Sequence, residues 1–181
     1  MIPKDSLPPQ NIEAERSTLG SVLIDKEAIN KVVDFLRPED FYSRAHQIVF
    51  TAMMELFNKR QPIDLLSLSN KLQETGELET VGGAGYLTSL INSVPTASNV
   101  AHYAKIVERK KTLRDLIDSA HHIIGLGYEE DEEIETILDQ AEQRLFSISQ
   151  KSNLPSFSHI GGALIKEAFE RMDRLHKGDG K

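Results

Sequence analysis

The glycine run Gly82–Gly85 is the pattern in this sequence that comes nearest to a phosphate-binding loop. A nucleotide-binding P-loop continues from its glycines into a lysine and a serine or threonine, because those side chains hold the phosphates and the magnesium ion. Here the residues Tyr86, Leu87 and Thr88 follow instead, and no strand is expected before the run. We therefore interpret the glycines as a tight turn that leads into a helix over 86–92.

The histidines are the other residues that could do chemistry, and they stand at positions His46, His102, His121, His122, His159 and His176. None forms a two-turn metal pair with a carboxylate, and the HExxH and GxSxG motifs are absent. The sequence has no cysteine, which excludes disulfides, thiolate zinc sites and cysteine nucleophiles. We expect no catalytic residue, no metal site and no bound cofactor in this chain.

Charge argues against a domain whose main task is to hold DNA. The formal net charge is -7, and an acidic surface repels phosphate backbones. The one basic cluster comprises Arg109, Lys110, Lys111 and Arg114. We interpret it as a solvated helix face, with a contact to nucleic acid or to an acidic partner as the alternative. No apolar stretch is long enough for a transmembrane helix and no signal peptide begins the chain, so we expect a cytoplasmic protein without membrane contact.

Hydrophobic residues recur at the helical period through the whole chain, which predicts an all-α protein. Helices are expected after an N-cap at Asn11, near 26–36, from a proline-started turn at Pro38, over 41–58, over 65–74 with a cap at Asp64 or Ser67, and over 86–92. Pro95 ends this part. We expect a globular helical head at 1–95, a long antiparallel helical hairpin at 96–150, a linker at 151–159, and a terminal amphipathic helix with the end of the chain at 160–181.

The hairpin carries more apolar surface than two helices can bury against each other. Residues Val100, Tyr103, Ala104 and Val107 share one arc and should pack on the head. Later apolar residues lie on another, broader arc, and the second helix offers only a narrow stripe from which Phe146 deviates. We expect the hairpin of a second subunit to cover this surface, with interface residues Leu113, Leu116, Ile117, Ile123, Ile124 and Phe146. The alternative is that the head or a bent helix covers it.

Two further contact surfaces are expected. The hairpin tip, with Leu126 and Tyr128, is a candidate contact for a partner protein, because apolar residues stand at a turn there. The terminal helix presents a docking face made of Leu164, Ile165, Phe169, Met172 and Leu175. A helix this short is marginal in water, so we expect it to form when it docks on another subunit. The glycines near Lys181 read as an abrupt stop, which suggests a truncated chain.

Five sequence blocks resemble bacterial replicative DNA helicases of the DnaB type, in the same order. They are LPPQNIEAERSTLGSVLID (residues 7–25), PEDFYSRAHQIVFTAM (38–53), PIDLLSLSNKL (62–72), VGGAGYLTSL (81–90) and PTASNVAHYAKIVERKKTLRDLI (95–117). Together they span most of residues 7–150. Arg16 is a small departure, since the family often has glutamine at this position.

The resemblance implies a non-catalytic N-terminal collar module that acts in subunit assembly, as a dimer or a hexameric collar, during DNA replication. It implies docking of the primase C-terminal domain and, in some bacteria, of a helicase loader. ATP, magnesium and most nucleic-acid contacts would belong to a motor domain that this chain lacks. The alternative function is a stand-alone helical adaptor or DNA-binding regulator, which would need a basic recognition helix.

Overall fold

Helices make up all the regular structure in the part of the chain that the computed structural model describes, which is residues 7–129 and 132–152. In chain order the elements are α1 (Ile12–Ile24), η1 (Ala28–Lys31), η2 (Pro38–Asp40), α2 (Arg44–Asn58), α3 (Leu65–Glu74), α4 (Gly83–Asn92), η3 (Ala97–Asn99), α5 (Val100–Leu126) and α6 (Ile134–Ser152), where η marks a 3-10 helix. The predicted all-α class is confirmed. None of these helices combines the length and the apolar character needed to cross a membrane.

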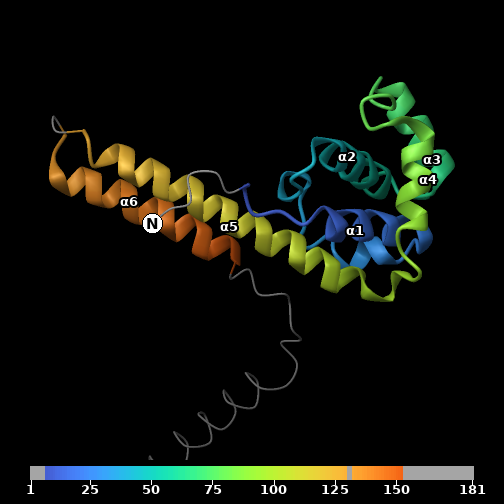
Figure 1. The fold of residues 1–181 in the computed structure, drawn as a ribbon, viewed down its shortest axis with the longest axis horizontal. Coiled ribbons are helices and arrows are strands. Elements are labelled where there is room, and N and C mark those ends of the chain that lie inside the picture. The colour runs from blue at the N-terminus through green and yellow to red at the C-terminus, as the bar shows by residue number, and fades with distance from the viewer. Residues whose placement is uncertain (1–6, 130–131, 153–181) are drawn as a thin grey trace, which may run out of the picture.

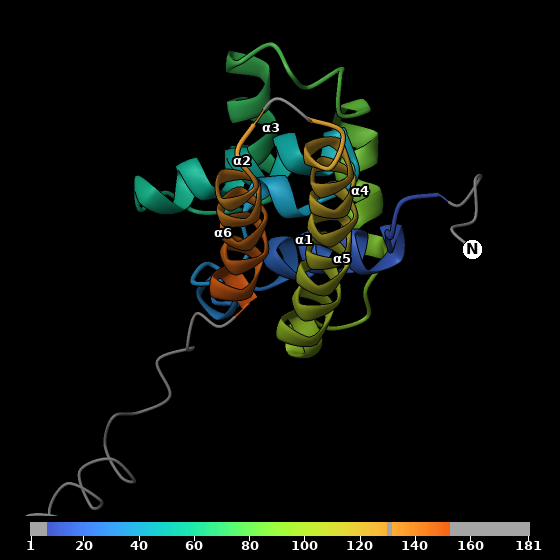
Figure 2. The ribbon, with the colours of Figure 1, turned by 90° about the vertical axis from the view of Figure 1, so that its left-hand side faces the viewer.

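Helix α1 is the centre of the head, and α2, α4 and the first half of α5 all pack against it (Figure 1). Helix α5 then leaves the head, and α6 returns beside it in the opposite direction, so that the two form a long antiparallel hairpin. Figure 2 looks along this hairpin and shows its two helices side by side in front of the head.

The head core contains residues from every α-helix of the head and from the start of α5. Its largest fully buried apolar side chains are Phe41, Phe50, Leu19, Ile29, Leu36, Met53, Leu68, Leu72, Leu87 and Leu90. Val100, Ala104 and Val107 are buried in the same cluster, and Tyr103 on the same arc is half-buried. The first turns of α5 therefore belong to the head in packing terms, as their separate apolar arc predicts.

Local signals fix several helix ends as the sequence predicts. The Asn11 side chain accepts from the backbone N–H of Ala14 at 2.9 Å, and the Asp64 side chain accepts from that of Ser67 at 2.8 Å. Each bond satisfies one N–H at a helix start that has no partner within the helix. Gly82, in the left-handed region, forms the turn before α4 as predicted, but the helix begins at Gly83 and not at Tyr86, so Gly83, Ala84 and Gly85 lie in its first turn.

Three predicted boundaries are wrong. Residues 26–36 form the 3-10 helix η1 and turns instead of one helix, and the extended backbone of Arg37 before Pro38 prevents a continuous helix into the next segment. The sequence predicts that the first hairpin helix ends at about residue 124 and that Gly125 and Gly127 form a turn, but α5 passes through Gly125 and ends at Leu126, because a single glycine costs a helix only about 1 kcal/mol. The second hairpin helix is predicted over about residues 132–149, but α6 spans Ile134–Ser152.

Candidate interaction surface on the helical hairpin

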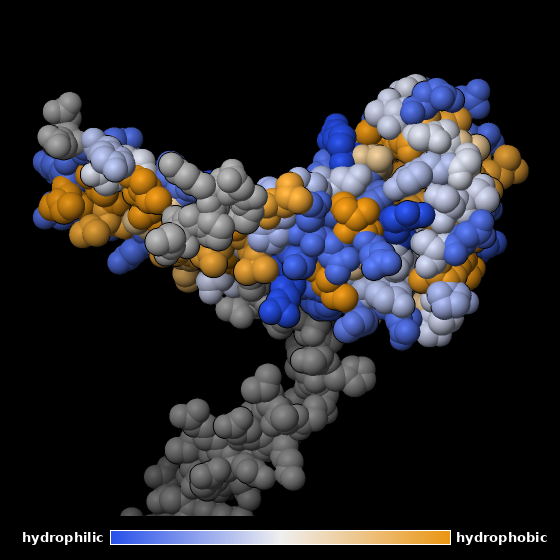
Figure 3. Space-filling model, in the orientation of Figure 1, coloured by the Kyte–Doolittle hydropathy of each residue, from blue (hydrophilic) through white to orange (hydrophobic). Residues whose placement is uncertain are grey.

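The outer part of the hairpin exposes a series of large apolar side chains on both of its helices. In α5 these are Leu113, Leu116, Ile117 and Ile124, and in α6 they are Ile134, Leu138, Leu145 and Phe146. Phe146 is 63 % exposed, whereas Ile123 is half-buried. Apolar colour follows the outer hairpin in Figure 3. A surface of this kind on a long, thin element is typical of a protein interface, because isolated apolar residues are common but contiguous ones are not.

The tip of the hairpin differs from the expectation at one residue. Leu126 is only 3 % exposed, so its predicted exposure at the tip is wrong. Because α5 continues through Gly125, Leu126 lies two helical turns after the buried Ser119 and on the same face, within the hairpin. Tyr128 is 82 % exposed and remains the large side chain that the tip presents.

The remaining residues that the sequence analysis named are the linker, the terminal helix, the histidines and the basic cluster. Of the linker predicted at 151–159, residues 151–152 belong to α6 instead, and residues 153–159 lie outside the described residues, as does the docking face of Leu164, Ile165, Phe169, Met172 and Leu175. His102, His121 and His122 are exposed on α5, as is Arg109 of the basic cluster. Lys111 of that cluster pairs with Asp115 one turn later.

Arg114 is the cluster member whose position the sequence analysis did not foresee. Its guanidinium donates to the backbone carbonyl of Pro9 at 2.8 Å and to that of Asp40 at 2.6 Å. It also lies over the Tyr42 ring, 5.7 Å from the ring centre. A solvated helix face is therefore the wrong interpretation for Arg114, which joins the base of the hairpin to two segments of the head.

Asp40, whose backbone carbonyl accepts from Arg114, has a side-chain carboxyl with a raised pKa. Burial raises the pKa of its carboxyl to about 6, against the opposing effect of the Arg37 backbone N–H, which donates to the carboxylate at 2.7 Å. The neighbouring carboxylate of Glu39 raises the pKa further. At neutral pH the ionised form of Asp40 therefore has a higher free energy in the folded chain than it would have in water.

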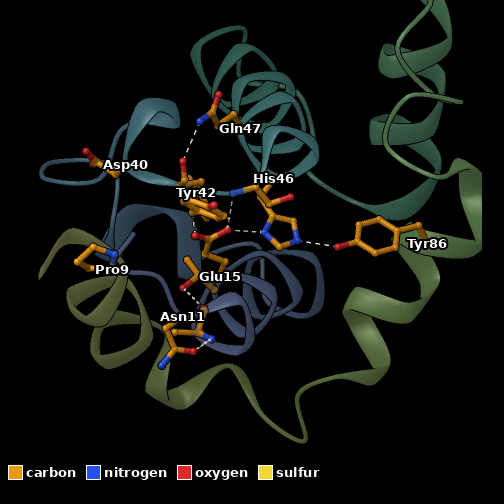
Figure 4. A network of polar contacts seen from close by, with 12 residues as sticks. Pro9, Asn11, Glu15, Asp40, Tyr42, His46, Gln47 and Tyr86 are labelled. Atoms are coloured by element: carbon orange, nitrogen blue, oxygen red, sulfur yellow. Dashed lines mark hydrogen bonds and ion pairs between the residues drawn. The ribbon is translucent and has the colours of Figure 1, made fainter. Parts of the chain in front are cut away.

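A buried polar network ties three helices of the head together (Figure 4). The Glu15 carboxylate of α1 accepts from the backbone N–H groups of Tyr42 at 2.7 Å and Ser43 at 3.2 Å. It also contacts Nδ1 of His46 in α2 at 2.6 Å, and Nε2 of that ring lies 2.6 Å from the hydroxyl of Tyr86 in α4. This network was not predicted from the sequence, although Glu15 stands one turn before Leu19 on the buried face of α1, where a carboxylate is unusual.

Carboxylate, imidazole and hydroxyl in series resemble the arrangement that activates a nucleophile. Here burial raises the pKa of Tyr86, which favours the protonated phenol and not a reactive phenolate. The side chains of His46 and Glu15 are 0 % and 2 % exposed, so a substrate could not reach them. No group of three metal-binding side chains occurs in the described residues. The network therefore has the properties of a structural tie.

A protein-family model described as "DnaB-like helicase N terminal domain" matches residues 7–109. Among curated proteins, the replicative DNA helicase DnaC of Bacillus subtilis is 41 % identical over 97 % of this chain. The replicative DNA helicase DnaB of Geobacillus stearothermophilus is 39 % identical over 98 % of it. In both cases the chain spans 39 % of the relative's length.

Two solved structures of DnaB-type helicases also match the chain. The N-terminal domain of DnaB helicase from Mycobacterium tuberculosis superposes with a TM-score of 0.74 and 38 % identity, over 78 % of this chain and 99 % of that one. A DnaB-like replicative helicase, in a structure described together with its interactions with primase, matches with a TM-score of 0.66 and 27 % identity. That match covers 90 % of this chain and 35 % of the other.

Proposed function

The chain belongs to the family of DnaB-like helicase N-terminal domains, and we propose that it is the non-catalytic collar of a replicative DNA helicase. In this proposal the hairpin assembles subunits and the collar docks primase during DNA replication in the cytoplasm. The names of the relatives support a role in DNA replication. Because the chain spans 39 % of their length, it corresponds to one part of such a helicase. ATP hydrolysis with magnesium would take place in the remainder.

The exposed apolar surface of the hairpin is the observation that carries the proposal. Leu116 and Ile117 of α5 and Phe146 of α6 are each between 43 % and 63 % exposed. Full burial of one such side chain contributes about 1.5–3 kcal/mol, so a few of them can hold a dimer. The alternative that the head or a bent helix covers them has no support, because these side chains keep this exposure with the head in place.

A second copy of the hairpin is the occupant that suits this surface best. Two-fold symmetry would bring the same apolar residues of both copies together, as an isologous interface requires. Four helices would then share one apolar core, which is a stable packing arrangement. The interface residues would be Leu113, Leu116, Ile117, Ile123, Ile124 and Phe146, and further contacts between dimers would complete a collar.

Primase docking is supported by the solved DnaB-like replicative helicase that is described together with its interactions with primase. Tyr128 is our candidate contact, because an exposed tyrosine at a helical turn offers apolar area and a hydroxyl. Leu126 could contribute only if the tip opened. A helicase loader, and docking of Leu164–Leu175 on a neighbouring subunit, remain parts of the proposal that rest on the family. A stand-alone adaptor or DNA-binding regulator has no observation in its favour.

The test is the oligomeric state of the chain in solution. Analytical ultracentrifugation over a concentration series should show self-association, and Phe146→Glu should shift it toward the monomer by at least tenfold in dissociation constant. Leu66→Glu is the matched control, because Leu66 is 71 % exposed on α3 of the head, away from the hairpin. A strict monomer at millimolar concentration, or equal effects of both variants, would contradict the assembly role.

A further inference from the structure

The guanidinium of Arg16 has no ion-pair partner among the described residues. Its Nε has no contact with solvent and no hydrogen-bond partner, and its terminal NH2 reaches only the Ser89 hydroxyl at 3.5 Å. No carboxylate pairs with it in the described chain, where the ion pairs are formed by His46, Lys71, Lys105 and Lys111. A guanidinium stays charged at any physiological pH, and a buried donor without an acceptor is costly, so this arrangement requires an explanation.

The packing of α1 on α4 holds the Arg16 side chain in place. One turn after Arg16, a Cβ built on Gly20 would lie 2.1 Å from the backbone oxygen of Leu90, so the two helices touch through their backbones. On the α4 side, the Ser89 hydroxyl donates to the Tyr86 carbonyl at 2.7 Å, which leaves its lone pairs for Arg16. The Ser89 contact and the buried Nε limit the freedom of the guanidinium before any ligand arrives, which reduces the entropy lost on binding.

Arg16 lines a cleft between α1, the end of α4 and the start of α5. The other polar side chains of this cleft are Asn11, Glu13, Ser17, Ser93 and Tyr103, and its apolar wall includes Ile106. Within the described residues, the hydroxyls of Ser17 and Tyr103 bond to no protein group. The cleft thus gathers a guanidinium and two free hydroxyls, with one carboxylate at its edge.

We propose that this cleft binds a single carboxylate, presented by an acidic side chain of a partner protein. A carboxylate can reach the terminal nitrogens of the guanidinium, whose planar donors it matches, whereas Nε is closed off from solvent. With one cation and one anion in the lining, a singly charged group is favoured over a doubly charged phosphate or sulfate, which Glu13 would repel more strongly. The half-buried Ile106 adds apolar area that a free anion would not use but a flanking side chain would.

The proposed site does not depend on hairpin assembly. Its test follows the Arg16 Nε–H resonance by NMR in the ¹⁵N-labelled chain. The resonance is identified by its loss in Arg16→Gln. Sodium acetate, sodium sulfate and the capped dipeptide acetyl-Leu-Glu-amide are titrated against sodium chloride at constant ionic strength. Acetate should shift the resonance saturably with a dissociation constant of roughly 5–80 mM, the range for one charge-assisted contact. Sulfate should bind more weakly, and the dipeptide at least fivefold more tightly.

Glu13→Gln should reverse the order of acetate and sulfate, whereas Glu79→Gln, on the loop before α4, should leave it unchanged. The same titrations in Phe146→Glu keep this result separate from the assembly role, since the cleft should bind equally well in that variant. Equal shifts in chloride and acetate, or a shift that never saturates, would overturn the site. Equal affinity for acetate and the dipeptide would overturn the assignment to a protein partner.

Discussion

Arg114 in the middle of α5 donates to the backbone carbonyl of Pro9, at 2.8 Å, across 105 residues of sequence. The same guanidinium donates to the carbonyl of Asp40 and stacks on Tyr42, whose backbone N–H binds Glu15. The last core residue of α5 is Val107, so Arg114 lies two turns beyond the core and holds the hairpin where it leaves the head. Arg114 therefore contributes to the direction in which the proposed assembly surface leaves the head.

Replacing Arg114 with alanine should loosen this joint. We expect a loss of about 2 kcal/mol in the free energy of unfolding, because two charge-assisted hydrogen bonds to backbone oxygens disappear. Spin labels on the head and near the hairpin tip should report a broader distance distribution by electron resonance. Arg109→Ala, an exposed position on the same helix, is the control and should change neither quantity. An unchanged distribution in Arg114→Ala would show that the packing of α5 alone sets the hairpin direction.

Asp40 should make the chain less stable as the pH rises. Its folded-state pKa of about 6 lies above the ordinary value, so between about pH 4 and pH 6 the folded chain binds more protons than the unfolded chain. Stability therefore falls across that window, by about 1–2 kcal/mol after allowance for solvent screening. Asp40→Asn keeps an oxygen for the Arg37 N–H and should remove this decrease. Urea unfolding at pH 4, 5, 6 and 7 measures it, and an identical slope in both proteins would refute the prediction.

The sequence predicted the helices well where the local signals were complete. The caps at Asn11 and Asp64 and the separate arc of Val100 and Val107 all depend on neighbours within one or two turns, and the structure confirms them. The segment at 26–36 failed because Ile29 and Val32 fit both an α-helix and a 3-10 turn followed by irregular chain.

The polar contacts were beyond sequence reasoning because their partners are far apart in the chain. Glu15 and His46 are separated by 31 residues, and Arg114 and Asp40 by 74. The only local sign was a carboxylate on the buried face of α1, which indicates that a partner exists but does not identify it. The residues of the proposed assembly surface could be named because apolar periodicity is local, whereas the partner that we propose to cover them cannot be identified from one sequence.

Glu15→Gln should destabilise the head by about 3 kcal/mol, because it removes one partner of a buried charge-assisted contact and leaves His46 and two backbone N–H groups with a weaker acceptor. Glu13→Gln is closely matched, since Glu13 is exposed in the same first turn of α1 and feels the same helix dipole. Its effect should stay within about 0.5 kcal/mol. Chemical denaturation followed by circular dichroism gives both values. Similar losses in the two variants would mean that the network contributes little beyond the helix start.

Gly20 tests how closely α1 and α4 must approach. An alanine there would place its Cβ 2.1 Å from the backbone oxygen of Leu90 and 2.6 Å from Val94, and a backbone atom cannot turn away as a side chain can. The helices would have to separate, which should cost about 3 kcal/mol, at the upper end for an overpacked core. Gly85→Ala, in α4 with no atom within 4 Å of the new Cβ, should instead gain about 0.5–1 kcal/mol from helix propensity. Thermal unfolding of the two variants should therefore shift in opposite directions, and a neutral Gly20→Ala would show that the contact between these two helices is looser than the structure describes.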